Sequence, residues 1–126
     1  MSEASKGIGY DISLRLSKHY SVVVSAKSLS LLNALSLNIN QNNGSAIAIS
    51  CDVRHVDEID ELIKEAYNWK KRLDVVIYNA GAITWGPVEK TPLNKFDLLQ
   101  AVLLFQEFRF FLPTIPFLLI LPFFFT

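Results

Sequence analysis

The sequence has one cysteine, five glycines and no excess charge of either sign over its 126 residues. A single cysteine, Cys51, excludes an internal disulfide framework and favours a reducing compartment. Twelve basic and twelve acidic side chains cancel, so we expect neither nucleic acid nor an acidic lipid surface as a partner. With only two histidines beside that cysteine, we expect no metal site. No apolar signal-peptide core follows Met1, and we therefore expect a cytoplasmic protein.

Glycine and charge are also missing from the last part of the chain. No glycine follows Gly86, and no charged residue follows Arg109. The last 24 residues, from Leu103, hold eight phenylalanines, six leucines, three prolines and two isoleucines. We therefore expect two parts, a globular domain over residues 1–102 and an apolar Phe/Leu/Pro-rich tail over residues 103–126.

Within the globular part, short apolar runs alternate with helical patterns. The runs at 21–26, 46–51 and 74–78 lack strict polar alternation, which is typical of strands buried on both faces of a parallel sheet. Apolar residues at helical spacing predict helices over 8–16, 29–37, 56–66 and 91–102. Strands that alternate with helices indicate βαβ units, and the sequence therefore predicts an α/β fold with right-handed crossovers.

Residues that suit a ligand follow each predicted strand. Lys27 follows the first run, Asp52-Val53 the second and Asn79-Ala80-Gly81 the third. The carboxyl ends of parallel strands meet at the edge where such sheets bind ligands. A glycine turn, Ser5-Lys6-Gly7-Ile8-Gly9, stands before the first helix. Its glycines would let a pyrophosphate approach the backbone and the free N–H groups of the helix. Alone, this turn fits a plain glycine-rich loop equally well, but the whole series in this order predicts a dinucleotide site.

In this pattern the chain resembles the short-chain dehydrogenase/reductase family. The glycine motif of that family reads Thr-Gly-x-x-x-Gly-x-Gly, and its fourth strand ends in Asn-Asn-Ala-Gly. Residues 2–9 and 78–81 fall on these motifs, and Asp52-Val53 falls on an Asp-Val pair at the adenine pocket. The resemblance covers residues 4–102, about two-fifths of a typical family domain. It implies an α/β fold class, a partial Rossmann-like doubly wound parallel sheet with the first strand and C-terminal half missing. Residues 1–102 are then a partial NAD(P)-binding Rossmann-like domain.

The resemblance implies a role for each cofactor-binding residue. Backbone groups of the glycine turn would lie against the pyrophosphate. Asp52 would accept a hydrogen bond from the adenine amino group, and Val53 would pack beside the ring. Asn79, Ala80 and Gly81 would border the adenosine ribose. The cofactor-binding residues implied in this way are Ser5, Lys6, Gly7, Ile8, Gly9, Lys27, Asp52, Val53, Asn79, Ala80 and Gly81.

Two lysines indicate NADP as the cofactor in place of NAD. Lys6 and Lys27 match positions where NADP-preferring family members carry basic residues. A phosphate dianion needs cations, whereas a member that prefers NAD would carry a carboxylate at the end of the second strand. Neither position is acidic here. The alternative for Lys27 is a solvated surface lysine without a ligand.

Three departures from the family pattern affect the cofactor end. Only Met1-Ser2-Glu3 precedes the turn, where the family has a central first strand between those that end at Ala26 and Tyr78. Losing that strand should expose two pairing edges and part of the core. Glu3 replaces the first motif glycine and puts an anion near the pyrophosphate position. Tyr78 replaces the first asparagine of the fourth-strand motif.

The catalytic residues of the family have no counterpart in this sequence. The family uses a tyrosine whose pKa is lowered by a lysine four residues later, a serine that orients substrate and an asparagine in the fourth helix. Leu103 stands where the asparagine is due, and Tyr67 with Lys71 has the right spacing but precedes the Asn79 strand. We therefore expect Tyr67 to be a packed aromatic residue and assign no catalytic residue.

The predicted function is that of an NADP-linked oxidoreductase of the short-chain type, which transfers a hydride between a carbonyl and an alcohol. We expect this chain to be a truncated and inactive form, so that a small carbonyl or alcohol substrate is a partner of the full-length protein only. One alternative is a non-catalytic dinucleotide-fold fragment that binds nucleotide weakly or associates through its exposed edges. Another is a small tail-anchored, membrane-associated protein.

The tail itself allows three interpretations. As a helix, residues 110–125 would span ~24 Å, short of the ~30 Å hydrocarbon core of a bilayer. Pro113, Pro116 and Pro122 also oppose a membrane anchor or a buried core helix. The favoured interpretation is that residues 103–126 are not native family sequence, because a translated pyrimidine-rich stretch, as in a retained intron or frameshift, is rich in these residue types.

Overall fold

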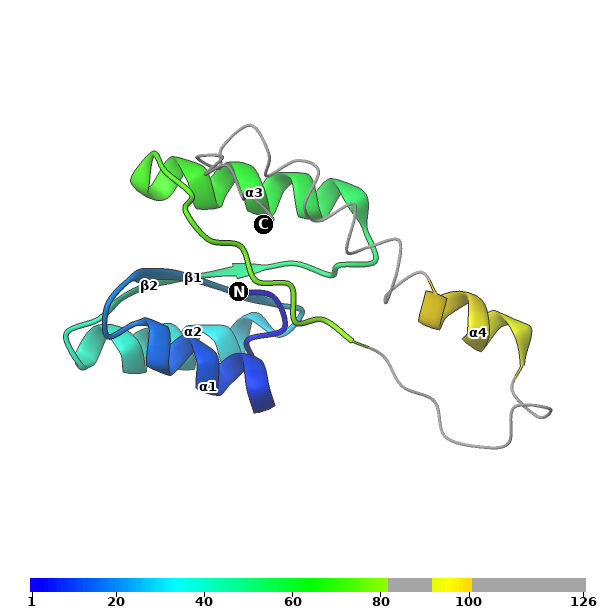
Figure 1. The fold of residues 1–126 in the computed structure, drawn as a ribbon, viewed down its shortest axis with the longest axis horizontal. Helices are drawn as coiled ribbons and strands as arrows, with labels where there is room; N and C mark the ends of the chain where they lie inside the picture. The colour runs from blue at the N-terminus through cyan, green and yellow to red at the C-terminus, as the bar shows by residue number, and fades with distance from the viewer. Residues whose placement is uncertain (82–91, 101–126) are drawn as a thin grey trace, which may run out of the picture.

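The computed structural model of the protein describes residues 1–81 and 92–100. The elements in chain order are α1 (Gly7–Leu16), β1 (Ser21–Ala26), α2 (Leu29–Gln41), β2 (Ser45–Ser50), α3 (Val56–Lys70) and α4 (Leu93–Gln100) (Figure 1). This order confirms the predicted alternation of helices and strands as far as α3. The expected tail at 103–126, with its anchor at 110–125, lies outside the described residues.

The described part of the sheet has two strands where we expected three. β1 and β2 pair in parallel, with Ser21 opposite Ser45 and Ala26 opposite Ser50. The third predicted strand, 74–78, lies outside any strand, and this part of the prediction is wrong. A strand needs a run of ladder hydrogen bonds to a neighbour. The neighbour of this segment is the short stretch from Met1 to Ala4, to which it is joined by the Ser2 N–H and the Ile77 carbonyl at 3.1 Å.

The first four residues lie between β1 and the segment 74–80 (Figure 1). The Ser25 N–H donates to the Met1 carbonyl at 3.0 Å, and the Ala4 N–H donates to the Ser25 carbonyl at 3.0 Å. The Met1 amino group donates to the Val23 carbonyl at 2.9 Å. The expectation of two exposed edges therefore needs a correction, because these residues close the carboxyl-terminal half of the gap.

Helices cover both faces of the sheet, with α1 and α2 on one side and α3 on the other (Figure 1). Side chains of consecutive strand residues point to opposite faces, and the core is accordingly divided in two. Val22, Val24, Leu32, Leu35 and Ile39 are among the buried residues of the first cluster. Ile49, Cys51, Ile59, Leu62 and Ile63 are among those of the second.

Two helices, α2 and α3, run longer than their apolar patterns predicted. α2 continues to Gln41, and its end is capped where the Asn42 side chain donates to the Asn38 carbonyl at 2.8 Å. α3 continues to Lys70, and the residue after it, Lys71, caps the helix with a left-handed φ of +56°. Asp57 and Glu58 lie in the first turn of α3, where acidic side chains complement the helix dipole.

Candidate functional site

The glycine turn exposes backbone at the start of α1. Gly7 takes a φ of +62°, and a Cβ placed on it would meet nothing within 4 Å. Gly9 is buried, and a Cβ there would overlap the Glu3 carbonyl oxygen and lie 2.9 Å from the Asn79 Nδ2. The two glycines therefore serve different purposes. Gly7 allows the turn and leaves open space beside it, whereas Gly9 lets α1 approach the chain at Glu3 and Asn79.

Lys27 and Asp52 meet at the carboxyl ends of β1 and β2. The Lys27 Nζ lies 3.5 Å from the Asp52 Oδ2, and the two side chains are 51% and 13% exposed. The Asp52 backbone N–H donates to the Glu58 Oε2 at 2.7 Å, which ties the strand end to the first turn of α3. Parallel strands that end side by side place these two charges together, as the sequence predicted.

Arg54 also binds the Asp52 carboxylate. Its Nε lies 3.0 Å from both oxygens, and its Nη2 donates to the Oδ2 at 2.5 Å. The hydrogen bonds from Arg54 hold the pKa of Asp52 well below its usual range, and Lys27 adds to this effect. Asp52 is therefore an ionised group that can only accept hydrogen bonds. An adenine amino group that binds there shares the carboxylate with Arg54. Sequence analysis missed Arg54. The signal was its position two residues after Asp52, because aspartate side chains commonly accept a hydrogen bond from the residue two positions later.

The loop 79–81 is held in place by Ser2. The Asn79 and Ala80 N–H groups donate to the Ser2 Oγ at 2.7 and 3.2 Å. The Ser2 residue is only 1% exposed, while a Cβ on Gly81 would meet open space. Sequence analysis missed this role of Ser2. The signal was its alignment with the threonine of the glycine motif.

The remaining predicted residues lie near this edge without a common contact. Lys6 is exposed before α1, and Ile8 is 70% exposed in its first turn. Ser5 is half-buried. Val53 is 5% exposed and belongs to the apolar cluster packed under α3. Its predicted packing against an adenine ring stays a prediction.

The Cys51 thiol is unsuited to act as a catalytic nucleophile. Burial raises the pKa of the Cys51 thiol to about 12, and the nearby Glu58, Asp52 and Glu3 carboxylates add to the shift. The thiol is therefore protonated at neutral pH and is a poor nucleophile. The Lys71 ammonium donates to the Asn68 side chain at 2.8 Å at the end of α3.

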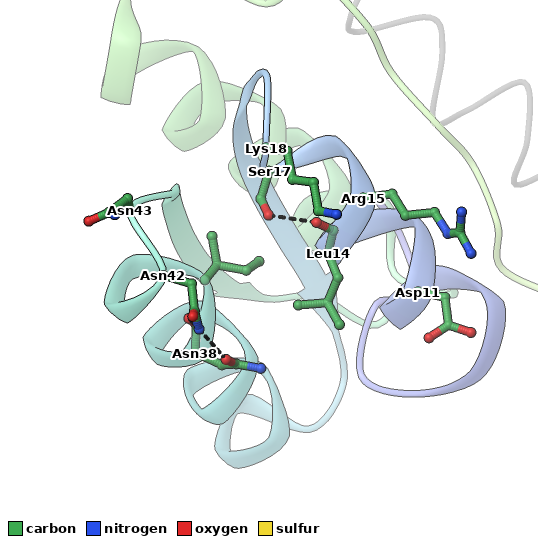
Figure 2. A pocket seen from close by; sticks show the side chains of 9 residues that line it. Asp11, Leu14, Arg15, Ser17, Lys18, Asn38, Asn42 and Asn43 are labelled. Atoms are coloured by element: carbon green, nitrogen blue, oxygen red, sulfur yellow. Dashed lines mark hydrogen bonds between the residues drawn. The ribbon is translucent and has the colours of Figure 1, made fainter.

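A cavity of about 900 Å³ lies elsewhere, where α1 and α2 end. Figure 2 shows Asp11, Leu14 and Lys18 from the α1 side and Asn38 and Asn42 from the α2 side around it. The carboxyl ends of helices carry a partial negative charge, which disfavours phosphate groups. Although Arg15 and Lys18 also line this cavity, its lining includes none of the predicted cofactor-binding residues.

Two other kinds of site are absent from the described residues. These residues hold no group of three or more His, Cys, Asp or Glu side chains that could bind a metal ion. Within residues 1–81 and 92–100, no helix combines the length and the apolar character needed to cross a membrane.

The chain as a whole matches a known family in sequence. A sequence model described as short chain dehydrogenase matches residues 3–118. The chain belongs to the short chain dehydrogenase family. This confirms the predicted resemblance and the Rossmann-like α/β fold class, and family members are NAD(P)-binding oxidoreductases.

Three similar proteins illustrate the relationship. The 3-oxoacyl-(acyl-carrier-protein) reductase of Synechocystis is 40% identical over 80 residues, 62% of this chain and 32% of that enzyme. Versicolorin reductase 1 of Dothistroma septosporum is 30% identical over 96 residues, 75% of this chain and 36% of that enzyme. The crystal structure of a metagenomic short-chain oxidoreductase in complex with NADP is 30% identical, has a TM-score of 0.83, and aligns over 91% of this chain and 53% of that one. The chain spans about a third of the length of the curated relatives it matches.

Proposed function

We propose that this chain is the adenosine-binding half of an NADP-linked oxidoreductase that interconverts a carbonyl and an alcohol. One observation carries the proposal. The exposed turn at Gly7, the Lys27–Asp52 pair and the loop 79–81 lie at the carboxyl edge of one parallel sheet. In an open α/β fold this edge is where ligands bind.

The donor set at this edge fits a dinucleotide. The free N–H groups at the start of α1 suit a pyrophosphate, and the open space beside Gly7 leaves room for it. Asp52 is an ionised acceptor that suits the adenine amino group. Asn79, Ala80 and Gly81 would border the ribose. NADPH would supply a hydride to the carbonyl and NADP⁺ would accept one from the alcohol, and the residues of this chain would bind and orient the adenosine end of the cofactor.

Cations at the adenosine end favour NADP over NAD. The side chains of Lys27 and Arg54 are 51% and 47% exposed, so both can reach a phosphate group without burial. Charge-assisted hydrogen bonds to a phosphate are about twice as strong as neutral ones. An NAD ribose, which lacks this phosphate, gains nothing from these cations.

The first experiment titrates the purified chain with NADPH and with NADH while nucleotide fluorescence is recorded. We expect NADPH to bind more tightly, and Lys27→Glu to weaken NADPH binding by about tenfold or more, because a charged hydrogen bond is lost and a repulsion is added. Binding of NADH should change much less.

Lys18→Glu is the matched control, because Lys18 precedes β1 whereas Lys27 follows it. It makes the same charge change at the opposite end of the strand. Equal losses for the two variants would mean that the net charge, and not a phosphate site, governs binding. The proposal would then fail for NADP.

The same preparation tests catalysis. The 126 residues contain no assigned catalytic tyrosine, serine or asparagine, and we propose that this chain binds NADPH without consuming it. The test is absorbance at 340 nm with a panel of aldehydes and ketones. Substrate-dependent loss of NADPH would overturn this part of the proposal.

A further inference from the structure

β2 is the outer strand of the described sheet. β1 pairs with one side of it, and no strand of the described residues pairs with the other side. The Cys51 N–H donates to the Ala26 carbonyl at 3.1 Å, which fixes the direction of the backbone groups along β2. Because successive residues of a strand turn their N–H and C=O groups to alternate sides, those of Ala46, Ala48 and Ser50 face away from β1. We call this side of β2 the outer edge.

The Asn40 side chain covers one position of the outer edge. Its Nδ2 donates to the Ala46 carbonyl at 3.0 Å, and its Oδ1 accepts from the Ala46 N–H at 2.7 Å. Asn40 is an exposed residue near the end of α2, the helix that lies beside β2 (Figure 1). Its amide therefore makes the same two hydrogen bonds with Ala46 that a residue of a neighbouring antiparallel strand would make.

The sequence of β2 lacks the features by which edge strands avoid pairing with other chains. Such features are charged side chains, proline and bulges. Ser45–Ser50 reads Ser-Ala-Ile-Ala-Ile-Ser, without charge or proline, and it pairs with β1 residue by residue without a bulge. A short uncharged segment of this kind favours strand pairing between chains when its edge is exposed. Asn40, which belongs to α2, is the residue that covers part of this edge.

We propose that the Asn40 amide prevents the outer edge of β2 from pairing with β2 of a second copy of the chain. A two-fold axis at Ala48 is the antiparallel arrangement that uses every outward residue. It places Ala48 opposite Ala48 of the second copy, and each Ala46 opposite a Ser50. The two Asn40 amides occupy both Ala46 positions, so only the pair at Ala48 can form. Because each hydrogen-bonded pair exchanges two bonds, about two of six bonds remain.

Amide hydrogen exchange of the full parent chain gives the first test. The Ala46 N–H is bound to the Asn40 Oδ1, whereas the Ala48 N–H faces the same side without such an acceptor among the described residues. We expect exchange at Ala46, corrected for intrinsic rates, to be about tenfold or more slower than exchange at Ala48. Equal corrected rates at the two amides would overturn the proposal, because Asn40 would then not cover the edge in solution.

The second test measures self-association of the full chain by sedimentation velocity over a series of protein concentrations. Asn40→Ala uncovers Ala46 and should strengthen dimerisation by about tenfold or more, with exchange at the Ala48 amide slowed as the concentration rises. Asn42→Ala is the matched control. It also removes two hydrogen bonds of an exposed asparagine at the end of α2, but none at β2, and it should associate as the parent does.

Ser50→Pro separates strand pairing from the association of misfolded chains. Proline removes the outward Ser50 N–H but no hydrogen bond to β1, so adding Ser50→Pro to Asn40→Ala should restore the association of the parent. Association of Asn40→Ala no stronger than that of Asn42→Ala, or association that persists after Ser50→Pro, would overturn the proposal. The exchange test on the parent decides the matter even where Asn40→Ala does not fold. No readout involves the cofactor, so the result is independent of the proposed NADP site.

Discussion

At Glu3 the backbone takes a φ of +49°, in the left-handed region that glycine adopts at little cost. The family motif has its first glycine at this position. A non-glycine residue there costs about 1 kcal/mol or more. We expect Glu3→Gly to stabilise the chain by about 1 kcal/mol, since relief of strain exceeds the entropy that glycine adds to the unfolded state. Urea denaturation measures the change.

Glu3→Ala separates strain from charge. It removes the carboxylate but keeps the left-handed residue, so stability should not rise. Both variants should strengthen NADPH binding if the Glu3 carboxylate repels the pyrophosphate. An equal gain in stability from both variants would show that charge, and not backbone conformation, is the cause.

Gly7 and Gly9 should respond differently to alanine. A Cβ on Gly9 overlaps the Glu3 carbonyl, so Gly9→Ala should destabilise the chain by about 3 kcal/mol through overpacking. A Cβ on Gly7 meets open space at a φ of +62°, so Gly7→Ala should cost about 1 kcal/mol. The measurement is chemical denaturation of both variants. Equal losses would contradict the different purposes assigned to the two glycines.

At the scale of elements, the loop between β2 and α3 contains an ionised carboxylate, that of Asp52, which binds Arg54 within the loop and Lys27 at the end of β1. Hydrogen bonds from Arg54 lower the pKa of Asp52, and an unfolded aspartate titrates near 3.9. The native state therefore binds fewer protons there than the unfolded state. The stability from Asp52 is fully present above about pH 4 and is lost as the pH falls through the folded pKa.

We expect Asp52→Asn to be less stable than the parent chain at neutral pH, with a difference that narrows below about pH 4. Thermal unfolding across this pH range gives the measurement. Asp11→Asn, at an exposed position of α1 outside its first turn, is the matched control and should change stability little. A difference in stability that stays constant from neutral to acid pH would show that the charge of Asp52 does not contribute to the stability of the fold.

At the scale of the whole molecule, one hydroxyl connects the two ends of the described core. The Ser2 Oγ accepts from the Asn79 and Ala80 N–H groups across 77 and 78 positions of sequence. Ser2→Ala leaves the buried Ala80 N–H and the partly buried Asn79 N–H without this acceptor, which should cost about 1–3 kcal/mol. It should also weaken NADPH binding, because the loop 79–81 loses its anchor.

Ser2→Thr keeps the hydroxyl and matches the family motif, so it should retain both stability and binding. Denaturation curves and the NADPH titration give the two readouts. A fully stable Ser2→Ala chain with unchanged NADPH affinity would contradict the anchoring role of Ser2.

Local signals in the sequence accounted for much of the fold. The apolar periodicity of α3 predicted its buried residues, which include Ile59, Leu62 and Ile63. The β-branched run at 21–26 predicted β1 with the right bounds. These predictions succeeded because the spacing of apolar residues that marks a helix or a strand is visible among neighbouring residues, without knowledge of the tertiary structure. The run at 74–78 has the same character but is no strand, because pairing depends on a partner from elsewhere in the chain.

The sequence by itself determined the family, the alternating order of elements as far as α3 and the position of Lys27 and Asp52 at the carboxyl ends of neighbouring strands, since each follows from motifs of a few residues. Only the tertiary structure decided which contacts those residues make. Arg54 folds back onto Asp52, Ser2 holds Asn79 and Ala80, and the first four residues close half of a gap. Such contacts depend on the geometry of the fold, and those of Ser2 join residues far apart in sequence, which no local pattern encodes.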